Sequence, residues 1–379
     1  ARLPTALALA GLILVTRALG ARLYDPWRGT VAAAILGTSV GMVALGKLIM
    51  PEPFLALAIA LSLFAVVRAV EDPSRRHWWS LAAWVAAALG SLSKGLHGLL
   101  LPVVIVALVA ALGPATRRPL AALARPHGIA LFLTFVLPWP LYIESQFPGY
   151  LWDNFLNEQL GHLFDTHFPR DSEPTPLHLL WTQHLVWWFP WVVFVLAAAV
   201  SRPDPRLRRG CPAFGAGARR AHPLAALPAV WLVTTAVAAS LSGQRQEYHT
   251  MFGWPAFALL LSRAWDGGEA RRGARLALAL PLALLAVLGA VGLAVYALGA
   301  DLPAGAETSA PFGARNSVLG VISGIAGVEW RRLRPLLLPA AGGLLLGAMG
   351  GLALAWRSET RRWSWLPIAA GTLGMLLAA

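Results

Sequence analysis

The sequence of 379 residues holds two lysines, and one of them, Lys94, lies at the end of an apolar run in the stretch LSKGLHGLLLP. A lysine at such a boundary can simply extend its ammonium to water, or it can pair with an anionic group such as a phosphate. Glu52 lies in LGKLIMPEPFLAL, where Pro51 and Pro53 restrict the backbone on both sides. Its carboxylate is either a solvated turn residue or a rigidly held group that faces a cavity, and an ion pair with Lys47 is a further alternative.

A third group of polar side chains occupies the stretch QRQEYHTMFGW, where Arg245, Glu247, Tyr248 and His249 are crowded between two apolar runs. A short charged connection is often only a turn. Arginine can also hold a phosphate through two parallel hydrogen bonds, whereas lysine acts as a point charge. Arg245 and Lys94 therefore predict an anion site if the fold brings them to the same end of the molecule.

Segment 145–177 carries side chains that could bind a metal or serve in acid–base chemistry. They are Glu158, His162, Asp165, His167 and Asp171. Imidazoles and carboxylates are ligands for divalent metals, but the spacing matches no HExxH motif. Glu158 and His162 are the metal candidates, beside the alternative that all five have ordinary polar roles.

The elements that must position these residues are membrane spans. Apolar residues make up 57% of the chain and charged residues 13%, with a mean hydropathy of +0.62, more apolar surface than a soluble chain of this length could bury. Long apolar runs predict an all-α polytopic membrane protein with about twelve transmembrane helices. The single cysteine, Cys211, excludes a disulfide framework. Spans are expected at 3–20, 30–48, 53–70, 80–93, 96–112, 128–144, 178–200, 223–241, 250–264, 276–299, 335–356 and 363–379.

The net charge of +13 indicates membrane orientation rather than nucleic-acid binding. Every second connection between the spans is rich in arginine, and together these connections hold 20 of the 29 arginines. They are 21–29, 71–79, 113–127, 201–222, 263–275 and 357–362. The positive-inside rule makes them cytoplasmic, so the other connections, with the candidate residues, face outward. Segment 300–334 is the weak point, because a short helix there would reverse the last two spans.

The stretch YLWDNFLNEQLGHLF inside segment 145–177 is too polar to span a membrane. It places Leu151, Phe155, Leu156, Leu160 and Leu163 near helical spacing. This pattern predicts an amphipathic helix that lies on the outer membrane surface.

Six stretches together resemble the bacterial GT-C glycosyltransferases of family 39, the group of the aminoarabinose transferase and the protein O-mannosyltransferases. They are ARLPTALAL, LGKLIMPEPFLAL, LSKGLHGLLLP, LPWPLYIESQFPGYLWDNFLNEQLGHLF, HLVWWFPW and QRQEYHTMFGWPAFALL, within roughly residues 1–262. The resemblance implies a GT-C fold and transfer of a sugar from a polyprenyl-phosphate donor to lipid A, a protein or another envelope glycan. The reaction is expected at the periplasmic face of the bacterial inner membrane, with inversion of the anomeric centre. A divalent metal is implied for some members.

The resemblance also assigns roles to residues. Lys94 matches the lysine of the family's Lys-Gly element, and Arg245 and Tyr248 match its basic-plus-tyrosine element, so these three are expected to bind the donor. Glu52 stands at the family's aspartate position and is expected to be catalytic. We also expect Asp171 to contact substrate.

Segment 157–162 departs from the family pattern. Glu158 matches the glutamate of the family's Asn-Glu-His stretch and is expected to bind substrate. Gln159 replaces the histidine, and His162, also a substrate-binding candidate, replaces an arginine. These differences weaken the expected metal and phosphate contacts.

The family's first outer loop, with its paired acidic residues, precedes the ARLP element at which this sequence begins. We therefore expect a fragment that lacks the first span and the first periplasmic loop, with the main general base in that loop. Residues 1–299 are expected to form the catalytic module, and residues 300–379 a periplasmic connection with the C-terminal helices. A transporter or flippase of lipid-linked glycans and a non-catalytic assembly partner are the alternatives.

Overall fold

The computed structural model describes residues 2–121, 123–169, 173–201, 222–265, 272–298, 330–357 and 359–378, and every regular element in these ranges is a helix. The helices are α1 (Leu3–Leu23), α2 (Pro26–Gly37), α3 (Val40–Gly46), α4 (Glu52–Glu71), α5 (Arg76–Lys94), α6 (His97–Ala111), α7 (Pro114–Ala121), α8 (Pro126–Val136), α9 (Pro138–Gln146), α10 (Tyr150–Trp152), η1 (Asp153–Gly161), α11 (His162–Phe164), α12 (Leu177–Thr182), α13 (His184–Trp187), η2 (Trp191–Phe194), α14 (Val195–Val200), α15 (Leu227–Leu241), η4 (Glu247–Gly253), α16 (Trp254–Leu261), η5 (Ser262–Trp265), α17 (Arg272–Leu298), α19 (Trp330–Trp356), η6 (Arg361–Trp363) and α20 (Trp365–Ala378). Of these, η1 is a π-helix and the other η elements are 3-10 helices.

Each of the twelve expected spans overlaps at least one of these helices. Within the described ranges, five helices are long and apolar enough to cross a membrane, or up to seven if each of two bent helix pairs is one span. A helical backbone satisfies its own hydrogen bonds, which a segment in hydrocarbon requires. The all-α polytopic membrane architecture is therefore confirmed.

The chain forms two compact units. Unit 1 comprises residues 1–36, 45–181 and 208–260, and unit 2 comprises residues 37–44, 182–207 and 261–379. The expected boundary between residues 299 and 300 stays a prediction. Segment 300–334, whose course decides the last two spans, lies for the most part outside the described residues.

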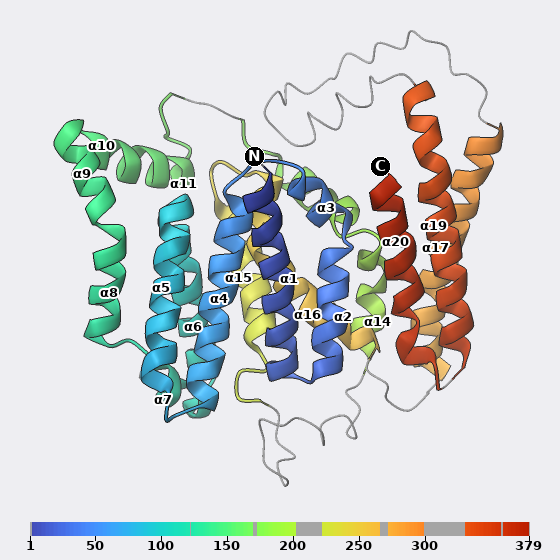
Figure 1. The fold of residues 1–379 in the computed structure, drawn as a ribbon, viewed down its shortest axis with the longest axis horizontal. Helices are drawn as coiled ribbons and strands as arrows, with labels where there is room; N and C mark the ends of the chain where they lie inside the picture. Colours follow the sequence, from blue (N-terminus) through green and yellow to red (C-terminus); the bar gives the residue numbers. More distant parts are fainter. Residues whose placement is uncertain are drawn as a thin grey trace. The chain divides into compact units, whose positions relative to one another are not determined.

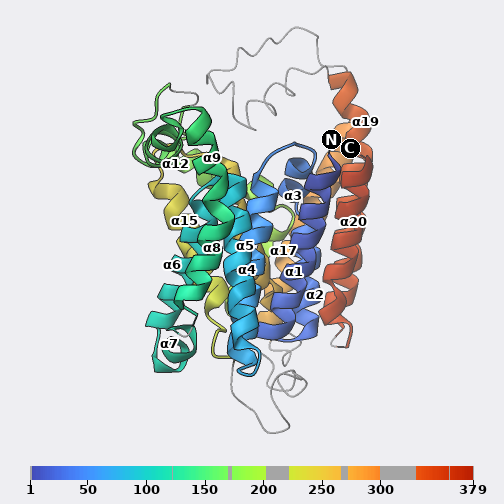
Figure 2. The same ribbon diagram turned by 60° about the vertical axis from the view of Figure 1, so that its left-hand side comes forward.

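Helix α4 is the centre of unit 1, and Figure 1 shows it between α1 and α5. Its fully buried side chains Leu55, Ile59, Leu63 and Val67 recur once per turn. Its 20 residues extend about 30 Å, which matches the hydrocarbon thickness of a bilayer. Glu52 and Glu71 thus mark opposite ends of unit 1, which we call the Lys94 end and the Glu71 end. Figures 1 and 2 show α9 at the Lys94 end and α7 at the other.

Unit 2 is held by buried aromatic side chains and by close helix packing. The rings of Trp191, Phe194 and Trp265 pack on one another, and the Trp265 indole donates a hydrogen bond of 3.1 Å to Ser364 Oγ. Helix α19 packs against α17 and α20. None of the candidate site residues among the described ranges lies in unit 2.

Candidate functional site

Lys94 and Glu52 form an ion pair at the Lys94 end of unit 1. Lys94 is the last residue of α5 and Glu52 is the first residue of α4, and the ammonium contacts Glu52 Oε1. The Glu52 side chain is only 3% exposed, whereas that of Lys94 is 26% exposed. The alternative of an ion pair between Glu52 and Lys47 is therefore wrong, because Glu52 pairs with Lys94. Lys47 is exposed, and the partner of Glu52 is a lysine that is 42 residues away in sequence.

Tyr248 covers a second side of the Lys94 ammonium, which lies 5.2 Å from the centre of its ring. The adjacent His249 ring lies 4.7 Å from that of Tyr248. Burial lowers the pKa of His249 well below its usual value, and the positive charge of Lys94 lowers it further. His249 is therefore a neutral imidazole at pH 7.

The turn that carries Lys94 is locked by a glutamine from segment 145–177. Gly95 has a φ of +66°, and a Cβ there would lie 2.3 Å from Gln159 Nε2. Leu96 donates its backbone N–H to Gln159 Oε1 at 3.2 Å. Glycine suits both the positive φ and the close contact with Gln159, because it has no Cβ. A glycine directly after Lys94 is therefore required by the structure of this turn. The sequence suggested only that Gln159 was a weak metal ligand. It did not predict that the Gln159 side chain contacts Gly95 and binds the Leu96 N–H.

The connection at 242–249 docks onto segment 145–177 through backbone hydrogen bonds. Gly243 donates its N–H to Leu163 O at 2.7 Å, and Gln244 donates to His162 O at 3.0 Å. The arginine pattern predicted that connections 49–52, 94–95, 145–177 and 242–249 lie on one side of the membrane. The Lys94–Glu52 pair and these backbone bonds place all four at the same end of unit 1. That grouping is confirmed.

Arg245 serves this docking in the described structure. Its Nε donates to Thr175 O at 3.2 Å, and its Nη1 donates to Ser242 O at 3.1 Å. Thr175 in turn donates its N–H to Arg245 O at 2.8 Å. Arg245 therefore lies at the predicted end of the molecule, where its guanidinium holds two loops together.

Glu158 and His162 lie beside a third residue, His167. Glu158 Oε1 is 3.2 Å from His167 Nε2, and Glu158 Oε2 is 3.7 Å from His162 Nδ1. The two imidazole rings are 3.9 Å apart. Asp171, the remaining substrate-binding candidate of this segment, lies outside the described residues.

The expected amphipathic helix is present as α10, η1 and α11, although its middle is a π-helix. Leu156, Leu160 and Leu163 are exposed on it. These side chains are available to a membrane surface, and the position of the helix on that surface stays a prediction.

The Glu71 end gathers three of the arginine-rich connections. Glu71 Oε2 lies 2.9 Å from Arg68 Nη1 and 3.6 Å from Arg22 Nη1. Its Oε1 lies 3.4 Å from His222 Nε2. In unit 1 the arginine-rich connections thus lie at the Glu71 end, and the connections with the candidate residues lie at the Lys94 end.

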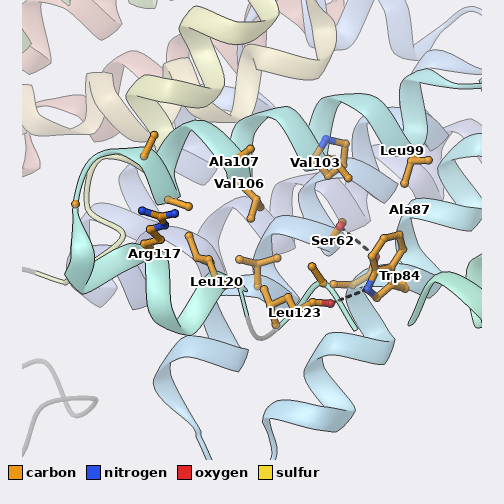
Figure 3. Close-up of a pocket in the computed structure, with 18 residues that line it drawn as sticks. Ser62, Trp84, Ala87, Leu99, Val103, Val106, Ala107, Arg117, Leu120 and Leu123 are labelled. Atoms are coloured by element: carbon orange, nitrogen blue, oxygen red, sulfur yellow. Dashed lines mark hydrogen bonds between the residues drawn. The ribbon is translucent and has the colours of Figure 1, made fainter. Parts of the chain in front are cut away.

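An apolar pocket of about 790 Å³ lies between α5, α6 and α7 (Figure 3). Its lining includes Trp84, Leu99, Val106 and Leu123, and Arg117 lies near its α7 side. Along α6 the lining extends from Leu99 to Gly113, which corresponds to about 20 Å of helix. Its lining on α4 and α5 comprises Ser62, Val66, Ala83, Trp84 and Ala87, so the pocket extends from the first turns of α6 toward α7 at the Glu71 end.

Residues 1–151 match the family model described as dolichyl-phosphate-mannose-protein mannosyltransferase. No curated protein matches the chain. The crystal structure of ArnT from Cupriavidus metallidurans in the apo state matches with a TM-score of 0.66 and 18% identity, over 100% of this chain and 60% of that one. The structure of the same ArnT bound to undecaprenyl phosphate matches with a TM-score of 0.63 and 19% identity, over 100% and 61%. The chain thus spans about three fifths of the length of ArnT.

These matches assign the chain to the class of GT-C folds, polytopic membrane proteins built from helices alone. Within that class, the resemblance to family 39 that the sequence motifs indicated is confirmed. The family model covers residues 1–151, less than half of the chain, and the match to ArnT shows a common fold.

Proposed function

We propose that the chain is the membrane part of a glycosyltransferase that moves a hexose or pentose from a polyprenyl-phosphate donor to an acceptor hydroxyl. The observation that carries this proposal is the Lys94 ammonium, held by Glu52 and Tyr248 at the end of the helices, on the same helical hairpin that lines an apolar pocket. A cation next to apolar surface suits a ligand with one phosphate and a long hydrocarbon chain. The ArnT bound to undecaprenyl phosphate supports this ligand class.

In this mechanism Lys94 binds the donor phosphate. An ammonium has three donors, and Glu52 Oε1 accepts only one of them. The exposed part of the side chain leaves room for a phosphate oxygen. Because Glu52 is buried against Lys94, we assign it to positioning the ammonium.

The bond changes balance around the anomeric carbon. The acceptor oxygen forms a bond to this carbon while the bond from the carbon to the donor phosphate breaks. Polyprenyl phosphate leaves with the electron pair, and Lys94 stabilises the negative charge that develops on it. A carboxylate takes the acceptor proton, and the resemblance places that base in the first outer loop of the family. Attack opposite to the leaving phosphate inverts the anomeric centre.

The pocket between α5, α6 and α7 is the proposed seat of the first part of the polyprenyl chain. It is lined by both helices of the hairpin whose turn carries Lys94, α5 and α6, and its lining is predominantly apolar. The hydrocarbon chain of a donor whose phosphate is bound by Lys94 reaches this surface by extending along α5 and α6. Burial of the polyprenyl chain adds to the binding energy of the ligand, so the single charged contact with Lys94 does not have to hold the whole donor.

The proposed location is the bacterial inner membrane, with the Lys94 end periplasmic and an envelope acceptor (lipid A, a protein or a glycan). The positive-inside rule supports this orientation, because arginines gather around Glu71. The separation of the two classes of connections in unit 1 supports it as well.

The test is the release of polyprenyl phosphate from a donor with a labelled sugar, with the purified chain in lipid nanodiscs and together with any segment that precedes it in its gene. We expect turnover, and we expect Lys94→Ala to lower kcat/KM about 30-fold, the equivalent of a charge-assisted contact of about 2 kcal/mol. Lys47→Ala removes the other lysine, which is exposed, and is the matched control with normal turnover expected. Movement of intact donor across the bilayer without release of phosphate would contradict the proposal and support a transporter.

A further inference from the structure

The apolar pocket between α5, α6 and α7 is long enough for one hydrocarbon chain. Its lining on α6 recurs at helical spacing and follows one face of the helix: Leu99, Pro102, Val103, Val106, Ala107 and Ala110. From Leu99 to Gly113 this wall extends about 20 Å. One leaflet of a bilayer contributes about 15 Å, half of the ~30 Å hydrocarbon core. The pocket can therefore hold the acyl chain of a lipid over the whole depth of its leaflet.

The polar side chains in the wall of the pocket already have partners within the protein. Ser62 Oγ donates a hydrogen bond of 3.1 Å to Ala83 O. Trp84 Nε1 donates one of 3.1 Å to Leu123 O (Figure 3). Apart from these two residues and Arg117, the described lining residues are alanine, glycine, proline, valine and leucine. Hydrocarbon is therefore the ligand that this surface stabilises by burial.

A cation lies at the α7 end of the pocket, which is the Glu71 end of unit 1. Among the described lining residues Arg117 alone carries a charge, and its exposed side chain makes no hydrogen bond or ion pair with the part of the chain that the structure describes. Arg125, one residue after the lining residue Ala124, is exposed as well. The sequence holds no aspartate or glutamate between Asp72 and Glu144, the stretch that forms α5 to α8. Its own side chains therefore leave the positive charge at this end uncompensated.

From these observations we propose that the pocket binds an anionic phospholipid, with the phosphate on Arg117 and one acyl chain along α6. A guanidinium can hold a phosphate through two parallel hydrogen bonds, and basic pockets between membrane helices suit anionic lipid head groups. Trp78, in the first turn of α5 at the same end, is 70% exposed, and exposed tryptophan is typical of the head-group level.

The lipid site stands on the pocket and its charges and does not require the transferase activity. Only its assignment to the cytoplasmic leaflet rests on the proposed orientation of unit 1. The polyprenyl chain of the proposed donor reaches the same pocket from the Lys94 end. The phospholipid therefore fills the pocket while no donor is bound, and a donor has to displace its acyl chain.

The alternative is a pocket that takes any hydrocarbon, with Arg117 only extending its guanidinium to water. A zwitterionic lipid with the same acyl chains should then bind as well as an anionic one. The charge of the head group thus distinguishes the two explanations, because the hydrocarbon contacts are identical for both lipids.

The experiment uses the full chain, purified in detergent and stripped of lipid, with dioleoyl-phosphatidylglycerol or dioleoyl-phosphatidylcholine added. Native mass spectrometry counts the bound lipids and gives the affinity for each. We expect one phosphatidylglycerol per chain, bound about fivefold more tightly than phosphatidylcholine, which corresponds to the ~1 kcal/mol of one arginine at an anionic head group. Arg117→Gln should remove this difference. Val106→Trp should weaken the binding of both lipids, because the indole takes the space of the acyl chain.

Arg75→Gln is the matched control, because it removes an exposed arginine at the same end of α5 that does not line the pocket. It should keep the preference for phosphatidylglycerol. Lys94→Ala should keep it too, so loss of donor turnover with intact lipid binding separates this proposal from the proposed function. Unfolding temperatures check that the variants fold. Equal affinities of the wild type for the two lipids, an unchanged preference in folded Arg117→Gln, or an equal loss in Arg75→Gln would show that the proposal is wrong.

Discussion

Removing the two partners of the Lys94–Glu52 pair should have unequal effects on stability. Lys94→Met keeps the aliphatic stem and removes the ammonium, which leaves a carboxylate that is only 3% exposed without its cation. The other oxygen, Glu52 Oε2, is buried and has no hydrogen-bond partner among the described residues, so nothing else compensates the charge. Glu52→Gln leaves an ammonium that is 26% exposed and can turn toward water.

The burial of each partner sets the expected magnitudes. Breaking a buried pair typically costs ~3–5 kcal/mol, and we expect about 3 kcal/mol for Lys94→Met because Lys94 is partly solvated. We expect about 1 kcal/mol for Glu52→Gln, the value of an ordinary hydrogen bond. The double variant leaves no uncompensated charge, so it should be more stable than Lys94→Met alone. The coupling between the two positions should be about 1–2 kcal/mol.

Equilibrium denaturant unfolding of the detergent-solubilised chain, followed by circular dichroism, measures all four members of this cycle. Lys47→Met is the control for loss of a lysine, and its free energy of unfolding should stay within about 0.5 kcal/mol of the wild type. Equal costs of the two single variants, or a double variant that loses the sum of both, would refute the asymmetry and show that the pair lies in a more solvated site.

Three further results are expected. Gly95→Ala should destabilise the chain by at least ~1–2 kcal/mol and make segment 145–177 more sensitive to protease, because the left-handed backbone and the contact with Gln159 both exclude a Cβ. The pKa of His249 in the folded chain lies below its unfolded value of about 6.5. As the pH falls below about 6.5 the unfolded chain therefore binds the proton first, and the stability of the folded chain should decrease. His249→Gln should flatten this part of a profile of unfolding temperature against pH. Val106→Trp should fill the apolar pocket and raise the KM for a long-chain donor more than for a short-chain one, whereas Leu108→Trp, on an exposed position of the same helix, should change neither.

The helical architecture could be predicted from the sequence because it depends on averages over many residues. Apolar runs of about twenty residues and the alternation of arginine-rich connections do not require any particular contact. The same reasoning placed Lys94 and Arg245 at one end of the helices, and the backbone bonds of Gln244 to His162 confirm that grouping. Asp171 could not be compared, because it lies outside the described residues.

Individual contacts could not be predicted, because they depend on which neighbours the packing supplies. Lys47 lies five residues before Glu52, yet the partner is Lys94 across a helix–helix contact. His167 follows an irregular loop, and its place beside Glu158 depends on the return of the chain to Asn157.

Gln159 shows how a departure from the family pattern can be compensated by its neighbours. The substitution of histidine by glutamine first suggests a lost metal ligand, but the glutamine side chain contacts Gly95 and accepts the Leu96 N–H. An imidazole is wider than an amide and offers one acceptor nitrogen in a fixed ring, so Gln159→His should loosen the Lys94 turn. Protease protection of segment 145–177 measures this effect, and unchanged protection in Gln159→His would show that the contacts of Gln159 do not hold the Lys94 turn.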